Sequence, residues 1–200
     1  MNHVDLAWIR QRISRHRPTS IARKLAPRRA AVASIFREET RGVELLFIRR
    51  ATQEQDPWSG HMAFPGGRME SQDSTPLDTA RRETLEEIQI DLQQSGRLIG
   101  PLDEIIASAR GRVLPLAISP FAFELVRPVN ARCDSVEVEQ ALWVPVSMLL
   151  DPAHSSTVPY ELGGQRFHLP CFRVFERTIW GLTYQMLMRM FAVLDWEPGI

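Results

Sequence analysis

The chain has 200 residues, of which 44% are hydrophobic, so it is long enough to form one domain with a core of ordinary size. Lys and Arg together number 24, as do Asp and Glu, and this balance gives no sign of binding to nucleic acid or to a membrane surface. No apolar run approaches the ~20 residues that a membrane-spanning helix needs. The two cysteines, Cys133 and Cys171, are too few for a disulfide framework, and a reducing cytoplasm is the compartment we expect.

Residues 1–29 form a basic segment that we separate from the rest of the chain. The segment holds seven arginines and one lysine against a single aspartate. Beginnings that are rich in arginine and poor in acids are typical of organelle-targeting peptides. However, Leu6, Ile9 and Ile13 follow helical spacing, which favours a basic amphipathic helix that lies on the domain. The basic face of such a helix could also meet an anionic substrate.

From residue 30 to residue 195 the chain alternates between strand and helix patterns, and we predict one domain over this range. The predicted strands cover residues 30–36, 43–49, 97–102, 113–125 and 140–144. Pro115 and Pro120 should break the fourth of these strands. Predicted helices cover residues 75–91 and 179–194, and a methionine-rich stripe on the second is typical of core packing. The interleaving of strands and helices predicts an α/β layered fold.

The helix at residues 75–91 has a clear start signal. Thr75 can cap it, Pro76 suits the first helical position, and Asp78 lies in the positively polarised first turn. Its predicted sheet-facing stripe consists of Leu77, Ala80, Thr84, Leu85 and Ile88.

Another side of this helix carries three carboxylates. Glu83, Glu86 and Glu87 fall within an arc of about 100° on a helix of 3.6 residues per turn. Carboxylates at this spacing repel each other unless a divalent cation such as Mg²⁺ lies between them. Arg82 lies four residues before Glu86 and can hold that carboxylate in position. An acidic pair alone is more commonly a solvated helix surface, and the metal interpretation depends on what precedes the helix.

A Gly-rich turn precedes the helix. Phe64-Pro65-Gly66-Gly67 looks like the end of a strand that runs into a turn, where glycine permits positive φ and a close approach of the backbone to a ligand. The turn and the acidic helix together predict a magnesium–phosphate site. Trp58, just upstream, either stacks on a substrate base or covers the edge of the core.

The turn and helix together resemble the Nudix box, in which Gly, five residues, Glu and seven residues precede Arg-Glu-U-x-Glu-Glu-x-Gly-U, with U an aliphatic residue. The matching residues are Gly67, Arg82, Glu83, Glu86, Glu87 and Ile90. Fourteen residues separate Gly67 from Arg82 where the pattern has thirteen, so Asp73 stands only approximately in the place of the first glutamate. Thr84 replaces an aliphatic residue, and Gln89 replaces the glycine at which the family usually ends this helix.

The one-residue expansion is similar to the coenzyme A pyrophosphatase branch of the family. Residues 142–152 and 179–183 also look like late segments of that branch. Upstream, members of the branch usually carry a Leu-Leu-Thr-x-Arg-Ser run, then an arginine and a glycine at set spacing. Here residues 45–50 begin this pattern, but residues 56–60 occupy the rest of it and the expected arginine is absent.

The resemblance implies a Nudix fold, a mixed sheet between helices, and Mg²⁺-dependent hydrolysis of a diphosphate linkage, with Mn²⁺ as a second option for the metal. The implied substrate is a nucleoside diphosphate derivative, either coenzyme A or a related compound. Glu83, Glu86, Glu87 and the Gly66 carbonyl would hold the metal, and Glu83 and Arg82 are the implied catalytic residues.

The predicted substrate-binding residues are Arg49, Arg50, Gly67 and Glu137. Many relatives recruit a further glutamate from a later loop, and Glu137 is favoured for this role over Glu104 and Glu139. Two alternatives stay open: a Nudix hydrolase of nucleotide sugars, dinucleoside polyphosphates or a damaged nucleotide, and a Nudix module that senses a nucleotide without cleaving it. The family resemblance also allows a homodimer, although no residue marks an interface.

Overall fold

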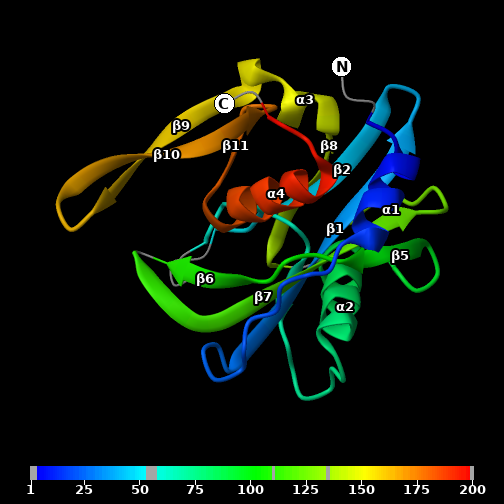
Figure 1. Ribbon diagram of the computed structural model, residues 1–200, viewed down its shortest axis with the longest axis horizontal. Coiled ribbons are helices and arrows are strands. Elements are labelled where there is room, and N and C mark those ends of the chain that lie inside the picture. Colours follow the sequence, from blue (N-terminus) through cyan, green and yellow to red (C-terminus); the bar gives the residue numbers. More distant parts are fainter. Residues whose placement is uncertain (1–3, 53–57, 110, 134–135, 199–200) are drawn as a thin grey trace.

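The computed structural model describes residues 4–52, 58–109, 111–133 and 136–198. Part of the divergent segment at residues 56–60, Asp56 and Pro57, lies outside the described residues. Within the described part an eight-stranded sheet forms the centre of the molecule (Figure 1). Its strands are β1 (Arg28–Glu39), β2 (Gly42–Arg50), β3 (Met62–Ala63), β4 (Gly66–Arg68), β5 (Gly96–Pro101), β6 (Ile105–Ala109), β7 (Arg112–Leu125) and β8 (Val138–Pro145).

The sheet is mixed. Its main order is β3-β2-β1-β7-β5, in which β1 and β7 are parallel and their neighbours are antiparallel. Strand β8 pairs with β2, β6 pairs with β7, and the short β4 pairs with β1. The pairing of β4 with β1 brings the predicted Gly-rich turn to the middle of the sheet.

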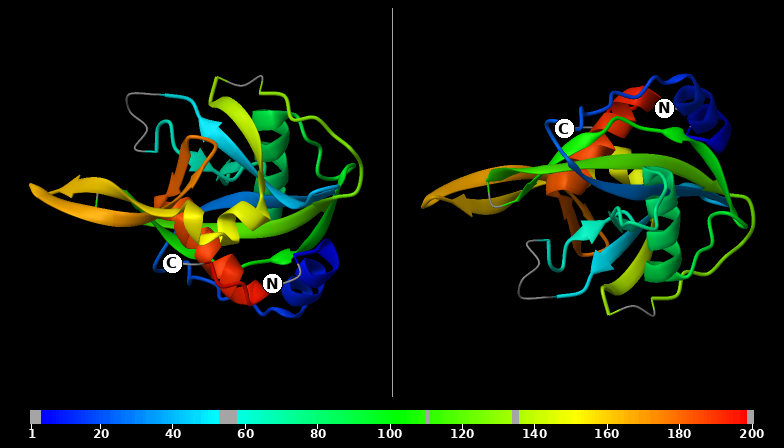
Figure 2. Two further views of the ribbon diagram at one scale, coloured as in Figure 1. Left: turned by 90° about the horizontal axis from the view of Figure 1, so that it is seen from above. Right: turned by 90° about the horizontal axis from the view of Figure 1, so that it is seen from below.

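Helices cover both faces of the sheet (Figure 2). Helix α2 (Pro76–Ile88) lies on one face, while α1 (Leu6–Arg15) and α4 (Gly181–Leu194) lie side by side on the other. Alternate residues of β1 pack on opposite faces of the sheet. Ala31 and Ala33 belong to the core under α2, whereas Val32 and Phe36 belong to the core under α1 and α4. The prediction of a mixed sheet between helices is confirmed.

A smaller three-stranded sheet was not predicted. It consists of β9 (Ser155–Leu162), β10 (Gln165–Val174) and β11 (Arg177–Trp180), and it follows the short α3 (Val146–Leu150) and a 3₁₀ turn at Pro152–His154. The β9–β10 hairpin extends away from the body of the molecule (Figure 1). Strand β11 returns the chain to the body and leads directly into α4.

The basic N-terminal segment contains the predicted helix. Leu6, Ile9 and Ile13 are buried in the same core as α4 and the sheet, as the helical spacing indicated. Strand β1 begins at Arg28, so the predicted division at residue 30 falls inside this strand. The segment is therefore packed into the domain that follows it.

Strand β7 and helix α4 differ from the prediction. Strand β7 runs unbroken from Arg112 to Leu125, so the prediction that Pro115 and Pro120 break it was wrong. Pro115 lies before the pairing with β1 begins and opposite the irregularity of β6 between Ile106 and Ser108. Pro120 lies opposite the junction of β5 and β6, where its carbonyl accepts from the Leu102 N–H at 2.9 Å. Helix α4 begins at Gly181, which has a φ of 64°, because the preceding residues pair with β10 as β11.

Helix α2 begins as predicted and ends earlier than predicted. Thr75 and Asp78 form a reciprocal capping box at its start. The helix ends at Ile88 because Gln89 adopts the left-handed conformation, with a φ of 58°, that the family usually gives to glycine. Leu85 is 47% exposed, so its assignment to the sheet-facing stripe was wrong, and Thr79 is buried instead.

In the described part of the chain, helices that could span a membrane are absent. Among the described residues, neither Cys133 nor Cys171 forms a disulfide.

Candidate active site

A cleft of about 1330 Å³ opens between α2, β4 and the first turns of α4. Carboxylates from α2 line one side of it, and apolar residues from α4 and β7 line another. The predicted site residues that line this cleft are Arg50, Gly66, Gly67, Arg82, Glu83, Glu86, Glu87 and Glu137. The structure thus brings together residues from four separate segments of the chain.

Both glycines of the turn lie in close contact with neighbouring groups. Gly66 has a φ of 149°, and a Cβ there would collide with the carbonyl oxygen of Ala31 on β1. A Cβ at Gly67 would collide with the carboxylate of Glu83. The first glycine therefore allows β4 to pair with β1, and the second leaves room for an acidic side chain from α2.

Glu87 is the most buried of the three glutamates that were predicted to bind the metal, with an exposed fraction of 2%. One of its carboxylate oxygens, Oε2, accepts a hydrogen bond from the Gly66 N–H at 2.8 Å. The other, Oε1, is buried and has no hydrogen-bond partner among the described residues. Burial raises the pKa of Glu87 to about 8, and the charges of Glu83 and Glu137 add to this effect, whereas the Gly66 N–H and Arg50 oppose it.

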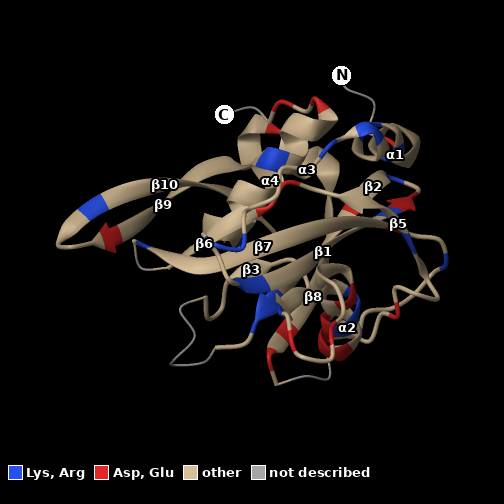
Figure 3. Cartoon of the chain, turned by 60° about the horizontal axis from the view of Figure 1, so that its bottom comes forward, with Lys and Arg blue, Asp and Glu red and all other residues tan. Residues whose placement is uncertain are grey.

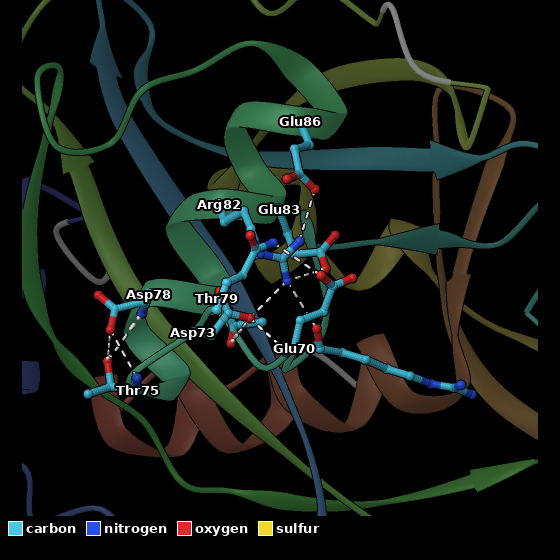
Figure 4. Close-up of polar contacts among 10 residues, drawn as sticks. Glu70, Asp73, Thr75, Asp78, Thr79, Arg82, Glu83 and Glu86 are labelled. Atoms are coloured by element: carbon cyan, nitrogen blue, oxygen red, sulfur yellow. Dashed lines mark hydrogen bonds and ion pairs between the residues drawn. The ribbon is translucent and has the colours of Figure 1, made fainter.

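The other two carboxylates differ in exposure. The Glu83 side chain is 13% exposed, and burial raises its pKa, opposed by Arg82. The Glu86 side chain is 55% exposed and forms the predicted ion pair with Arg82, at 2.9 Å. Arg82 also lies 3.0 Å from a Glu83 oxygen, so one guanidinium holds both carboxylates (Figure 4).

The principal partner of Arg82 was missed in the sequence analysis. Its Nε and Nη2 donate to the two carboxylate oxygens of Asp73 at 3.0 and 2.9 Å, a bidentate pair (Figure 4). Asp73 also accepts from the Glu70 N–H and the Thr79 hydroxyl. The hydrogen bonds from Arg82 lower the pKa of Asp73 to about 2, although burial opposes them. In the sequence, the approximate alignment of Asp73 with the first glutamate of the Nudix box was the signal that could have identified this residue.

The two predicted substrate-binding arginines are consecutive residues of β2, and only one of them lies in the cleft. Arg50 lines the cleft, whereas Arg49 forms an ion pair at 2.6 Å with Glu139 and does not line it. The later acids differ in their contacts, because Glu137, just before β8, lines the cleft, whereas Glu139 forms its ion pair with Arg49. Among the three candidates for the additional glutamate, the geometry favours Glu137.

Glu104, the third candidate, lies elsewhere. Its carboxylate accepts from the Ser119 hydroxyl at 2.6 Å, from the Ile21 N–H at 2.6 Å and from Arg29 at 3.3 Å. These contacts attach the N-terminal segment to the sheet. Glu104 is therefore a structural residue and not part of the cleft.

Aromatic and apolar residues complete the cleft. His61 and Trp180 have ring centroids 4.6 Å apart, and Trp58 lies nearby in the lining. The first turns of α4 contribute Leu182 and Met186, which the sequence analysis assigned to core packing alone. Strand β7 adds Leu114, Leu116 and Ile118. An acidic side and an apolar side thus face the same space.

The donor groups of the cleft determine whether it fits a metal ion. Among the described residues, no three His, Cys, Asp or Glu side chains already converge as a metal-binding group, and Glu86 is turned toward Arg82. The unpartnered Oε1 of Glu87 does fit a hard cation, because a buried carboxylate oxygen without a donor carries a desolvation cost that a cation would offset.

Comparisons with known proteins identify the family of the chain. The NUDIX domain pattern matches residues 26–160. The chain belongs to the Nudix family. The predicted family and fold are therefore confirmed, and the match includes the cleft residues from β1 to β8.

Curated relatives of this Nudix protein include two coenzyme A diphosphatases. An uncharacterized protein of Schizosaccharomyces pombe is 32% identical over 98% of this chain and 64% of its own length. The human mitochondrial coenzyme A diphosphatase NUDT8 is 29% identical over 80% of this chain and 66% of its own length. The peroxisomal coenzyme A diphosphatase ndx-8 of Caenorhabditis elegans is 33% identical over 56% of this chain and 46% of its own length. The chain thus spans slightly less than two thirds of the length of the first two relatives.

These names support the resemblance to the coenzyme A pyrophosphatase-like branch. Two of the relatives are named for mitochondria and peroxisomes, so the expected cytoplasmic location of this chain stays a prediction. Among solved structures, a MutT/nudix family protein from Enterococcus faecalis matches 95% of this chain with a TM-score of 0.53 at 14% identity. An Ap4A hydrolase of Caenorhabditis elegans matches 60% of it with a TM-score of 0.50 at 19% identity. At such identities the likeness supports the fold alone.

Proposed function

We propose that this Nudix protein is a divalent-metal-dependent pyrophosphohydrolase that cleaves the diphosphate linkage of coenzyme A or a closely related nucleoside diphosphate derivative. The observation that carries the proposal is Glu87, a buried carboxylate with one oxygen on the Gly66 N–H and the other without a partner among the described residues. A carboxylate in this state costs folding free energy unless a ligand uses it. Its position at the cleft wall supports a role in binding.

Mg²⁺ or Mn²⁺ would be held by Glu87, Glu83 and Glu86, with the Gly66 carbonyl and Glu137 as further oxygen donors. When bound, the metal would neutralise phosphate charge and lower the pKa of a coordinated water. Glu86 would exchange its contact with Arg82 for the metal. Only the Glu86 side chain would have to move for this exchange, because it is already 55% exposed.

The remaining side chains of the acidic side have complementary roles. Arg82, anchored by Asp73, positions Glu83 and limits the repulsion among the carboxylates. Glu83 has a raised pKa, which suits a group that takes a proton from an attacking water. Arg50 and Arg68 line the same cleft and can face the phosphates of a substrate.

The apolar side of the cleft supports a substrate with a long, weakly polar arm. Leu182, Met186 and Leu116 offer contact area but no charge, which suits a pantetheine-like chain better than a second nucleotide. The aromatic pair of His61 and Trp180 is placed to stack on a flat group. The names of the two coenzyme A diphosphatases support the same substrate class.

The alternatives give different results in one experiment. The protein would be incubated with Mg²⁺ and a panel of coenzyme A, ADP-ribose, UDP-glucose and diadenosine tetraphosphate. Release of 4′-phosphopantetheine and 3′,5′-ADP from coenzyme A at the highest kcat/KM is expected. Preferred hydrolysis of a nucleotide sugar or of the dinucleoside polyphosphate would replace the coenzyme A assignment with that of a related hydrolase.

The same panel tests the proposal of an enzyme against that of a sensor. A protein that binds one of these compounds in the presence of Mg²⁺ or Mn²⁺ but releases no product from any would be a nucleotide-sensing Nudix module. The Glu87→Gln variant serves as the control for contaminating hydrolases, because it differs by one atom and keeps the volume of the side chain.

A further inference from the structure

A second concave site lies on the opposite face of the sheet from α2. A groove of about 620 Å³ runs between the end of α1, the residues that follow it and the second half of α4. Its lining consists of Arg12, Arg15, His16, Arg17, Asp103, Arg189, Ala192 and Val193. The groove shares no residue with the Nudix cleft, and Figure 3 shows the basic residues on α1 and α4 far from the acidic ones on α2.

The positive charge of this groove is largely uncompensated. In the parts of the chain that the structure describes, Arg15, Arg17 and Arg189 form no ion pair. The one acid in the lining, Asp103, already accepts from the Thr19 N–H at 2.6 Å and contacts His16 at 3.1 Å. Three guanidinium groups are thus left facing a common space.

The groove is held in shape by the fold. Helix α1 is anchored by its three buried apolar residues, and the Trp8 indole N–H donates to the Leu194 carbonyl at 3.0 Å. Arg12 donates to the Val193 carbonyl at 3.1 Å and pairs with Asp195, which fixes the two helices to each other. Arg189 donates to the Glu104 carbonyl, so its guanidinium also has a defined position. The arginines therefore do not belong to a mobile basic tail.

A purely structural account covers only some of these charges. Arg12 and Arg15 lie in the last turn of α1, where positive charge complements the helix dipole. Arg17 lies beyond the helix and Arg189 lies in α4, so the helix dipole of α1 does not account for them. The hydrogen bond to the Glu104 carbonyl uses one guanidinium nitrogen of Arg189. Arginines without a carboxylate partner of their own are well suited to bind phosphate groups, since the guanidinium fork matches phosphate oxygens.

We propose that the groove between α1 and α4 is a binding site for a small phosphorylated compound, separate from the Nudix cleft. Arg15, Arg17 and Arg189 would donate to its phosphate oxygens, and His16 would face it from the same side. The volume of the groove falls within the range of about 300–1,000 Å³ that is usual for small-molecule sites. A concave site of this size suits a compact phosphate-bearing molecule better than a flat membrane surface.

The test uses the full chain and inorganic tripolyphosphate as the probe. Isothermal titration calorimetry would be performed in EDTA, which removes the divalent ions that could bridge the probe to the carboxylates of the Nudix cleft. The wild-type protein should bind the probe at one site, and the binding should weaken as NaCl is raised. The Arg15→Gln/Arg17→Gln variant should bind at least about tenfold more weakly, the change expected for one lost charge-assisted hydrogen bond.

A matched control removes two positive charges elsewhere. Arg41→Gln/Arg127→Gln alters two exposed arginines that do not line the groove, and it should bind the probe as the wild type does. Thermal unfolding of each variant establishes that it is folded. Arg189→Gln provides a second test from the other helix and should also weaken binding.

Three results would overturn the proposal. One is the absence of binding to the wild-type protein, and another is an equal loss of affinity in the control and groove variants. The third comes from sedimentation with vesicles of phosphatidylcholine, with and without phosphatidylglycerol. Binding to the anionic vesicles that depends on Arg15 and Arg17, without binding of tripolyphosphate, would reassign the groove to a lipid surface.

Discussion

Glu87 and Glu104 are both withdrawn from solvent, yet their surroundings differ. Both oxygens of Glu104 accept hydrogen bonds, from Ser119, Ile21 and Arg29. Glu87 has one backbone donor, and its second oxygen has no partner in the described residues. The fully paired Glu104 attaches one segment to another, whereas the missing partner of Glu87 supports the proposal that its carboxylate binds a ligand. Burial alone does not distinguish the two acids, but their hydrogen-bond partners do.

The largest effect should come from Glu87→Gln. Gln cannot supply the carboxylate that would bind the metal, so kcat for the preferred diphosphate should fall by roughly two to three orders of magnitude, as for the removal of a group that stabilises charge in a transition state. The free energy of unfolding in EDTA should not fall, because the variant no longer buries an ionisable group without a partner. Turnover at the wild-type rate would remove Glu87 from the proposed metal ligands.

Glu104→Gln tests the other side of the comparison. Removal of one partner from the nearly buried pair with Arg29 should lower the free energy of unfolding by about 3 kcal/mol, measured by urea denaturation. Glu161→Gln is the matched control, since Glu161 and Arg166 are both strongly exposed and the loss of their pair should cost less than about 1 kcal/mol. Folded Glu104→Gln protein should keep its turnover; a specific loss of kcat would return Glu104 to the active site.

Asp73 extends the comparison to an acid that is fully paired but lies beside the active site. Its pKa is lowered from 3.8 to about 2, chiefly by hydrogen bonds from Arg82, so it stabilises the fold above pH 3.8, and this stability is lost as the pH falls through 2. The contribution is about 2 kcal/mol. The stability of wild type should therefore exceed that of Asp73→Asn by this amount at pH 6.

Urea titrations at several pH values provide the measurement. The difference between wild type and Asp73→Asn should narrow once the pH falls below about 4. The same comparison in an Arg82→Gln background should show little pH dependence, because the partner that lowers the pKa is absent. A difference that stays constant down to pH 3 would show that Asp73 acts through its volume or neutral hydrogen bonds alone.

The sequence predicted the elements whose pattern is local. The cap at Thr75, the three acids of α2 and the amphipathic spacing of α1 depend on residues a few positions apart, and all appear in the structure. The early end of α2 depended on whether Gln89 could replace glycine in a left-handed conformation. Helical spacing does not reveal that.

Features that depend on distant partners could not be predicted. Pro120 is tolerated in β7 because it lies opposite the junction between β5 and β6. In the β9–β10 hairpin, β9 and the first six residues of β10 have no buried residue that would mark them as strands. In the site, the acidic residues of α2 and the pair of Arg82 with Glu86 were found from sequence, but the partners of Glu87 and Asp73 were not. The bond from Gly66 to Glu87 and the pair of Asp73 with Arg82 join positions 21 and 9 residues apart through the fold. Glu104, Glu137 and Glu139 became distinguishable only by their contacts.

The smallest effect is expected from Gly67→Ala, which tests how closely the Gly-rich turn packs against the acids of α2. The added methyl group would collide with the carboxylate of Glu83, which can swing away because it is the end of a flexible side chain. Stability should change by less than about 1 kcal/mol, whereas kcat should fall about tenfold, as for the loss of a contact that positions a ligand. Steady-state kinetics and urea denaturation on the same preparation would measure both.

A double-mutant cycle determines whether Gly67 acts through Glu83. If it does, the addition of Gly67→Ala to Glu83→Gln should lower kcat little further, because the carboxylate that the methyl group displaces is already replaced. Two losses that multiply would instead mean that Gly67 contributes by bringing its own backbone close to the substrate. The turn would then be a second ligand-binding element, independent of the acids of α2.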